Sequence, residues 1–268
     1  MLTPPALSLY VHIPWCVQKC PYCDFNSHAL KTEIPEEEYI SALLEDLDTD
    51  IEKYRLNEAP RPLHSIFIGG GTPSLISAEG IERLLKGIEA RIPFKPEIEI
   101  TMEANPGTIE AERFVGYRKA GVTRISIGVQ SFEQQKLERL GRIHGQDEAV
   151  NAAKLAHQIG LNSFNLDLMH GLPDQNIEQA LADLDKAIEL AADHAPKNTR
   201  AFGRGELGKH LLACGPRSES DEPKADERLF PSYVINWSIF QVNGRTPFPM
   251  PDPFKTYVQD VRTYLQSA

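Results

Sequence analysis

The chain has 268 residues and a formal net charge of −10, so it is long enough to bury a large core without disulfides or structural metals. An acidic surface repels phosphate backbones, which disfavours a nucleic-acid partner. Three of the four cysteines lie between residues 16 and 23, a spacing that disfavours a secreted disulfide framework and predicts metal binding in a reducing compartment. The chain start lacks the features of a signal peptide and no apolar run is long enough for a membrane span, so we expect a cytoplasmic protein.

Short apolar or β-branched runs alternate along the chain with longer segments of helical period, a pattern typical of βα repeats around a parallel sheet. The predicted strands are 7–13, 65–68, 98–103, 123–129 and 163–169. Because their interiors are nearly all apolar or β-branched, we expect them to be covered on both faces. The predicted helices are 36–54, 78–91, 109–119, 133–140, 147–159 and 176–192. The fold class is therefore α/β, a partial (β/α) TIM-type barrel with parallel strands.

The alternation ends near residue 192, and residues 193–268 form an atypical tail with many prolines and glycines. Within the tail, Tyr233 to Val242 is a weak candidate strand, and Phe254 to Leu265 is a weak candidate for a short helix. The pattern predicts two regions, a core of residues 1–192 and a poorly defined tail of residues 193–268.

Cys16, Cys20 and Cys23 form a Cys-x₃-Cys-x₂-Cys loop directly after the first predicted strand. Thiolates are the usual ligands of iron–sulfur clusters, most of which take four, so three cysteines leave one iron open for reaction. The alternative is a zinc site completed by His12 or His28, because three cysteines and one histidine form a common closed tetrahedron.

Polar or glycine-rich residues follow every predicted strand, and the carboxyl ends of parallel barrel strands share one mouth. The second strand is followed by Gly69 to Pro73, where glycines allow close approach to a ligand. The run is neither a P-loop nor a dinucleotide fingerprint. Glu103 and Asp167 could bind an amine, a hydroxyl or a cation at this mouth, although solvated loop carboxylates are an equally good interpretation of each taken singly.

Together these residues resemble the radical S-adenosylmethionine (SAM) superfamily, which combines the three-cysteine loop with a glycine-rich second strand end. The motifs at 10–14, 69–73, 128–132 and 167–173 are similar to those of the oxygen-independent coproporphyrinogen III oxidase and haem chaperone family. The resemblance covers residues 7 to about 192 and comprises several independent motifs in order.

The resemblance implies that Cys16, Cys20 and Cys23 ligate a [4Fe-4S] cluster and that SAM chelates its fourth iron, to be cleaved on reduction to a 5′-deoxyadenosyl radical. The positions that match the family's SAM site are Tyr10, Tyr22, Gly70, Gly71, Thr72, Glu103, Gln130, Arg142 and Asp167. The resemblance further implies haem or a porphyrin as the small-molecule partner, a protein that reduces the cluster, and a protein that accepts haem.

Two branches of the family differ beside the cluster. Decarboxylating oxidases carry a fourth cysteine two residues after the third and an N-terminal extension, whereas this chain has Phe25 there and places Tyr10 almost at its start. The resemblance therefore implies the haem chaperone branch. The alternatives are a radical SAM oxidoreductase acting on a porphyrinogen and a zinc-stapled binding module without enzymatic activity.

Family members continue after residue 192 with a sixth strand that the tail does not show. We expect that the tail arose from a frame shift or a truncation. If so, the barrel is incomplete at its C-terminal edge and leaves that edge unprotected.

Overall fold

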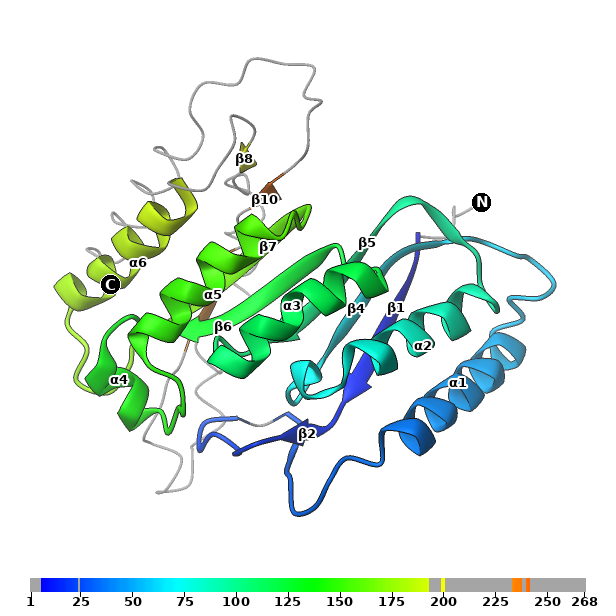
Figure 1. Ribbon diagram of the computed structural model, residues 1–268, viewed down its shortest axis with the longest axis horizontal. Coiled ribbons are helices and arrows are strands. Elements are labelled where there is room, and N and C mark those ends of the chain that lie inside the picture. Colours follow the sequence, from blue (N-terminus) through cyan, green and yellow to red (C-terminus); the bar gives the residue numbers. More distant parts are fainter. Residues whose placement is uncertain (1–5, 24, 193–198, 201–232, 238–239, 242–268) are drawn as a thin grey trace, which may run out of the picture.

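The computed structural model describes residues 6–23, 25–192, 199–200, 233–237 and 240–241. Five parallel strands succeed one another in the chain and lie in the same order in the sheet. They are β1 (Leu7–Ile13), β4 (Leu63–Gly70), β5 (Phe94–Ala104), β6 (Arg124–Gln130) and β7 (Ser163–His170). The prediction of an α/β fold with a partial barrel of parallel strands is confirmed (Figure 1).

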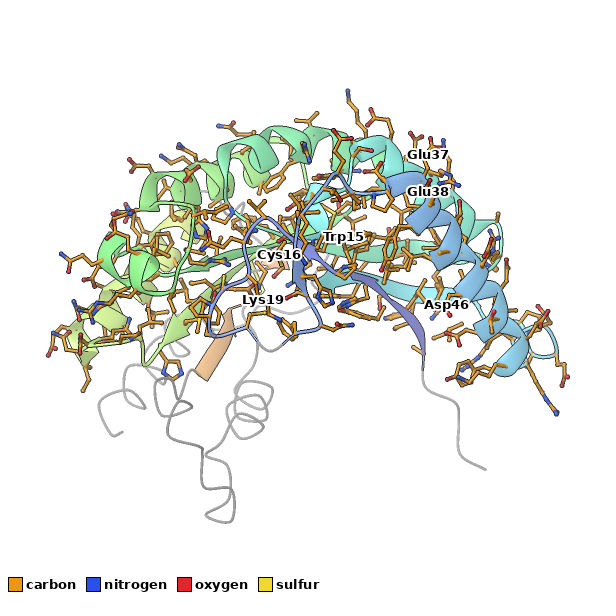
Figure 2. The ribbon with its side chains drawn as sticks, turned by 90° about the horizontal axis from the view of Figure 1, so that it is seen from below. Trp15, Cys16, Lys19, Glu37, Glu38 and Asp46 are labelled. Carbon is orange, nitrogen blue, oxygen red and sulfur yellow. The ribbon has the colours of Figure 1, made fainter. Side chains whose placement is uncertain are left out.

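Helices connect the strands and cover one face of the sheet, which curves away from them like an arch (Figure 2). All six predicted helices are present, and each begins and ends within two residues of the predicted bounds. They are α1 (Glu36–Lys53), α2 (Ala78–Glu89), α3 (Thr108–Ala120), α4 (Gln134–Arg139), α5 (Gln146–Gln158) and α6 (Ile177–Ala192). Among the helices that the structure describes, none is long and apolar enough to cross a bilayer.

The core lies between this helical layer and the sheet. Alternate strand residues point toward the helices, and most of them are buried there, as in Val11, Ile68, Met102, Ile127 and Leu166. Burying each such side chain contributes roughly 1.5–3 kcal/mol. The intervening residues point to the concave face.

The concave face is polar, although the interiors of the predicted strands are nearly all apolar or β-branched. On β6 it carries Arg124 and Ser126, and on β7 it carries Asn165 and Asp167. The predicted strands placed these residues among apolar neighbours, but only alternate positions face the helices. This face is therefore suited to binding a polar ligand.

The barrel is incomplete, as predicted, but the edge of β7 is not bare. The short strand β9 (Tyr233–Trp237) pairs with β7 in antiparallel orientation, from Leu166 opposite Trp237 to His170 opposite Tyr233. The candidate strand from Tyr233 to Val242 is thus divided, because β10 (Phe240–Gln241) pairs instead with β8 (Thr199–Arg200). The candidate helix from Phe254 to Leu265 lies outside the described residues.

Two very short elements frame the cysteines. β2 (Trp15–Cys16) and β3 (His28–Ala29) form a two-stranded parallel ladder around the loop between them. The 3₁₀ helix η1 (Pro73–Leu75) follows the glycine run after β4. Segments of two or three residues are too short to show a hydrophobic period, so the sequence did not predict them.

Tyr117 of α3 connects η1 to the helical layer. Its side chain is fully buried, and its hydroxyl lies 2.7 Å from the carbonyl oxygen of Ser74 and 2.8 Å from that of Ile76. The hydroxyl proton is thus available to two carbonyl groups, and Arg113 Nη1 also donates to that of Ser74 at 3.2 Å. The turn after the glycine run is therefore fixed to the helical layer.

Tyr117→Phe is expected to lower the free energy of unfolding by about 1–3 kcal/mol, because it removes the buried hydroxyl that the carbonyl groups of Ser74 and Ile76 share. Tyr54→Phe is the matched control, since Tyr54 is 62% exposed, and its effect should stay within about 0.5 kcal/mol. Urea denaturation followed by circular dichroism measures both. Equal effects of the two substitutions would contradict the anchoring role of Tyr117.

Candidate functional site

The cysteine loop runs from β2 to β3 and is closed by its own backbone (Figure 2). The backbone N–H of Cys23 donates to the carbonyl of Cys20 at 3.1 Å, and that of Leu30 donates to Cys16 at 2.8 Å. The amine of Lys19 donates to the carbonyl groups of Phe25 and Ser27 across the loop, at 3.2 and 3.1 Å. All three cysteines are free thiols, with Cys16 buried and the other two partly exposed.

The glycine run after β4 holds this loop against the sheet. The N–H of Gly71 donates to Ile13 at 2.6 Å, and the N–H of Thr72 donates to Trp15 at 2.7 Å. A Cβ at Gly71 would lie 2.5 Å from the Trp15 carbonyl oxygen, so no larger residue fits without movement. Gly70 has φ +117°, a conformation that favours glycine. The close approach that these glycines permit is therefore to the cysteine loop itself.

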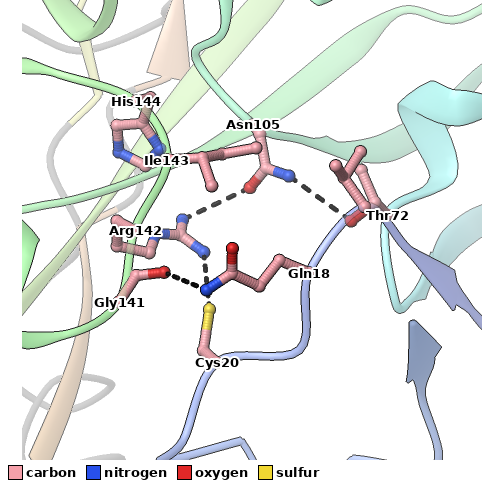
Figure 3. Close-up of a pocket in the computed structure, with 9 residues that line it drawn as sticks. Gln18, Cys20, Thr72, Asn105, Gly141, Arg142, Ile143 and His144 are labelled. Atoms are coloured by element: carbon pink, nitrogen blue, oxygen red, sulfur yellow. Dashed lines mark hydrogen bonds between the residues drawn. The ribbon is translucent and has the colours of Figure 1, made fainter. Parts of the chain in front are cut away.

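Arg142, between α4 and α5, joins the cysteine loop to the ends of two strands (Figure 3). Nη1 lies 3.6 Å from Cys20 Sγ, while Nη2 donates to the Gly128 carbonyl at 2.6 Å and to Asn105 Oδ1 at 3.3 Å. Asn105 in turn donates to the Thr72 hydroxyl at 3.3 Å. Cys20, Thr72, Asn105 and Arg142 line a small open pocket.

The guanidinium retains donor capacity in this pocket. Arg142 Nε is buried and has no hydrogen-bond partner among the described residues. A guanidinium beside the cysteine loop is well suited to receive a carboxylate. The donor set therefore fits a ligand that carries a carboxylate beside the cysteines.

Two carboxylates lie on the concave face near the pocket, Glu103 on β5 and Asp167 on β7. Burial raises the pKa of Glu103 to about 7, and the charge of Asp167 adds to the increase, while a 3.1 Å hydrogen bond from the Gly70 N–H opposes it. Burial likewise raises the pKa of Asp167 to about 6, opposed by Ser126 and by the arginines at 124 and 142. Two partly desolvated carboxylates of this kind fit an ammonium group or hydroxyl groups.

Gln130 ends β6 with φ +68°, an uncommon backbone conformation for a residue other than glycine. The turn behind it is fixed by Asp183 of α6, whose Oδ2 accepts from the Ser131 hydroxyl at 2.7 Å and whose Oδ1 accepts from the Phe132 N–H at 2.6 Å. Burial raises the pKa of Asp183 to about 6. Backbone strain of this kind persists where the surroundings over-determine it, as they do here.

The two tyrosines of the predicted set are placed differently. Tyr10 is 56% exposed, stacks on Phe67 and lies 3.0 Å from His12 Nδ1 through its hydroxyl. Tyr22 packs against Leu140 and its cluster, and burial raises its pKa, as does the neighbouring Cys20, whereas Arg142 lowers it. Tyr22 therefore packs the cysteine loop against the segments that follow α4 and β7, while Tyr10 lies on the exposed side of the loop.

A closed zinc site is not favoured by this arrangement. Among the described side chains, no three His, Cys, Asp or Glu groups are close enough to share one metal ion. His12 is hydrogen-bonded at both ring nitrogens, to Tyr10 and to the Asn26 carbonyl, and His28 Nε2 contacts the Asn26 side chain.

Contacts or electrostatic interactions connect most of the predicted set. Gly70 contacts Glu103, which interacts with Tyr10 and Asp167; Arg142 interacts with Cys20, Tyr22 and Asp167. The side chains of Gln130 and Arg142 both lie beside Gly128.

The sequence did not single out Asn105, the Gly128 carbonyl or Asp183 as parts of the site. Asn105 belongs to the polar run after β5, which was a usable signal, whereas nothing in the sequence pairs Asp183 with Ser131.

A comparison with protein families matches residues 10–187 to the radical SAM superfamily model. The chain belongs to the radical SAM superfamily. It is 63% identical over 194 residues to the heme chaperone HemW of Escherichia coli (strain K12), covering 72% of this chain and 50% of that protein. It is 64% identical over 190 residues to HemW of Haemophilus influenzae, covering 71% and 50%. The resemblance to the haem chaperone branch is thereby confirmed.

Among solved structures, this radical SAM chain is similar to coproporphyrinogen III oxidase (HemN) from Escherichia coli, a radical SAM enzyme. The TM-score is 0.64 at 25% identity, and the match covers 98% of this chain and 52% of that one. This chain spans about half the length of the curated relatives it matches. Membership of the superfamily implies a [4Fe-4S] cluster and SAM, which the donor set described above fits.

Glu103→Gln is expected to stabilise the cofactor-free protein at pH 8 by up to about 3 kcal/mol, the equivalent of a pKa raised from 4.5 to about 7. The raised pKa means that the folded state holds the proton more tightly, so wild-type stability falls as pH rises through this range. The advantage of the variant should therefore vanish below about pH 4.5. Urea titrations across pH test this.

Glu89→Gln, at the exposed end of α2, is the control and should show no such pH dependence. A Glu103→Gln variant that is no more stable than the wild type at pH 8 would show that this carboxylate is not desolvated.

Proposed function

We propose that this chain is a radical SAM protein of the haem chaperone type, which binds haem and passes it to an acceptor protein. The observation that carries the proposal is the 63% identity to a heme chaperone over 194 residues, combined with a cysteine loop whose third thiol is followed by Phe25. Phe25 is 63% exposed and has no metal-binding atom. It stands where the resemblance places a fourth cysteine in the decarboxylating branch.

Cys16, Cys20 and Cys23 would hold the [4Fe-4S] cluster. When bound there, the cluster and SAM supply the one-electron chemistry of the superfamily. The guanidinium of Arg142, which lies beside Cys20 and lines the pocket, suits the carboxylate of SAM.

The remaining residues would bind the rest of SAM. Glu103 and Asp167 suit its ammonium group and ribose hydroxyls, and Gln130 lies next to Arg142 beside Gly128. Gly70, Gly71 and Thr72 keep the cysteine loop close to the sheet, so that cluster and ligand meet. Tyr10 would border the site on the open side and Tyr22 would hold the loop from behind.

The partners follow from the same proposal. A protein that donates electrons would reduce the cluster, and the exposed side of the loop leaves a path to it. Free thiols of this kind persist in the cytoplasm, where we place the protein. A decarboxylating oxidase acting on a porphyrinogen is the second candidate, because the similar solved structure is that of coproporphyrinogen III oxidase.

We also propose that residues 1–192 form the radical SAM core and that residues 193–268 are a distinct tail, produced by a frame shift or a truncation. The loss of strand and helix periodicity in the sequence after residue 192 supports this boundary. Translating the other two frames of the coding DNA beyond codon 192 tests it. Absence of a resumed strand–helix pattern in those frames would count against a frame shift.

Anaerobic reconstitution with iron and sulfide should give a brown protein with close to four irons and four sulfides per chain. Each of Cys16→Ala, Cys20→Ala and Cys23→Ala should lose most of this iron. Colorimetric iron and sulfide analysis with a visible spectrum measures it. A colourless wild type that takes up only zinc would refute the cluster.

The reconstituted protein should bind haem and release no carbon dioxide from coproporphyrinogen III under anaerobic reducing conditions with SAM. Haem titration followed at the Soret band and a labelled carbon dioxide assay measure the two properties. Carbon dioxide release would identify the oxidase instead, and absence of haem binding would end the chaperone proposal. Phe25→Cys, assayed in parallel, tests whether this position alone separates the branches.

A further inference from the structure

Three polar side chains form a row across the concave face. The parallel register places Glu103 of β5 opposite Ser126 of β6, and Ser126 opposite Asn165 of β7. Ser126 and Asn165 are buried, at 6% and 2% exposure. Asp167 lies two residues beyond Asn165 on the same face of β7, because side chains alternate along a strand. The register of two strands therefore delivers two buried polar groups to one carboxylate.

These groups hold both oxygens of that carboxylate. The Ser126 hydroxyl donates to Asp167 Oδ2 at 3.0 Å, and Asn165 Nδ2 lies 2.5 Å from Asp167 Oδ1. Asn165 Nδ2 also donates to Ser126 Oγ at 2.9 Å. Each side chain is fixed by the other as well as by the carboxylate, so the Asp167 side chain has little rotational freedom.

We propose that Ser126 and Asn165 are positioning residues, which hold the Asp167 carboxylate in the orientation needed to accept hydrogen bonds from the hydroxyl groups of SAM. The inference rests on the proposed SAM site, since Asp167 is the residue that touches the ligand and the other two act through it. We call Ser126 and Asn165 the cradle of Asp167. Each carboxylate oxygen has more than one acceptor site, so a ligand can bind while the hydrogen bonds from the cradle remain intact.

The electrostatic surroundings agree with this role. Burial raises the pKa of Asp167, and the hydrogen bonds from Ser126 and Asn165 oppose that increase. The charged groups that face Asp167 are Glu103 on β5, Arg124 on β6 and Arg142 after α4. Without the cradle the carboxyl would take up a proton at a higher pH, and a neutral carboxyl is a poorer acceptor for hydroxyl groups.

The test is the dissociation constant of SAM for the reconstituted protein between pH 5.5 and 8.5, measured by equilibrium dialysis. Ser126→Ala should raise the dissociation constant about fivefold at pH 7, the loss expected for one hydrogen bond. It should also raise the acid midpoint, the pH at which protonation has half its effect on binding, by about one pH unit. Asn165→Ala should act in the same direction. Ser126→Thr keeps the hydroxyl and should restore both values.

Ser65→Ala is the matched control, because Ser65 is also a concave-face serine but donates to Ser8 instead of Asp167. It should leave both values unchanged. The carboxyl ¹³C resonance of Asp167, assigned with Asp167→Asn and followed against pH without SAM, gives a second readout. It should titrate near pH 6 in the wild type and higher in Ser126→Ala.

The outcomes separate the two proposals. If the wild type fails to bind SAM, the proposed function fails, while the ¹³C titration still tests the cradle. If the wild type binds SAM but folded Ser126→Ala and Asn165→Ala keep its dissociation constant, acid midpoint and ¹³C titration, the positioning role is overturned. If Ser126→Ala does not fold, Asn165→Ala decides by the same criteria.

Discussion

The candidate site depends on one constraint, the parallel register of β1, β4, β5, β6 and β7. Because all five strands run the same way, the segments that follow them emerge at one edge, where the cysteine loop, the glycine run and Arg142 meet. The same register sets which side chains lie across from one another on the concave face, as with Ser126 and Asn165. A shift of one residue in any pair would turn the polar set toward the helices and remove the site.

The polar groups of the concave face lower the stability of the folded chain and suit it to bind a ligand. Burial raises the pKa values of Glu103 and Asp167, so each of these carboxylates is costly to keep ionised. Hydrogen bonds from the Gly70 backbone and the Ser126 hydroxyl offset only part of this cost. Such an arrangement is typical of sites whose charge is completed by a ligand.

Much of the fold could be predicted because its signals are local. Apolar spacing predicted the helices to within two residues, and the three cysteines predicted a metal loop from eight positions of sequence. The rest depends on contacts between distant segments. Asp183 lies about fifty positions from the turn that it fixes, and Gly71 is required by the Trp15 carbonyl, which glycine spacing cannot reveal. The direction of β9 was equally hidden, since a short apolar run fits either orientation.

The antiparallel pairing of β9 has a consequence for synthesis. Backbone hydrogen bonds between strands do not require particular side chains, so β7 can pair with a short segment from far along the chain. On the ribosome, however, β7 and α6 are complete well before Tyr233 to Trp237 emerge. Through that interval the nascent chain presents an unpaired strand to its surroundings, and chaperone engagement during translation becomes important for the yield of folded protein.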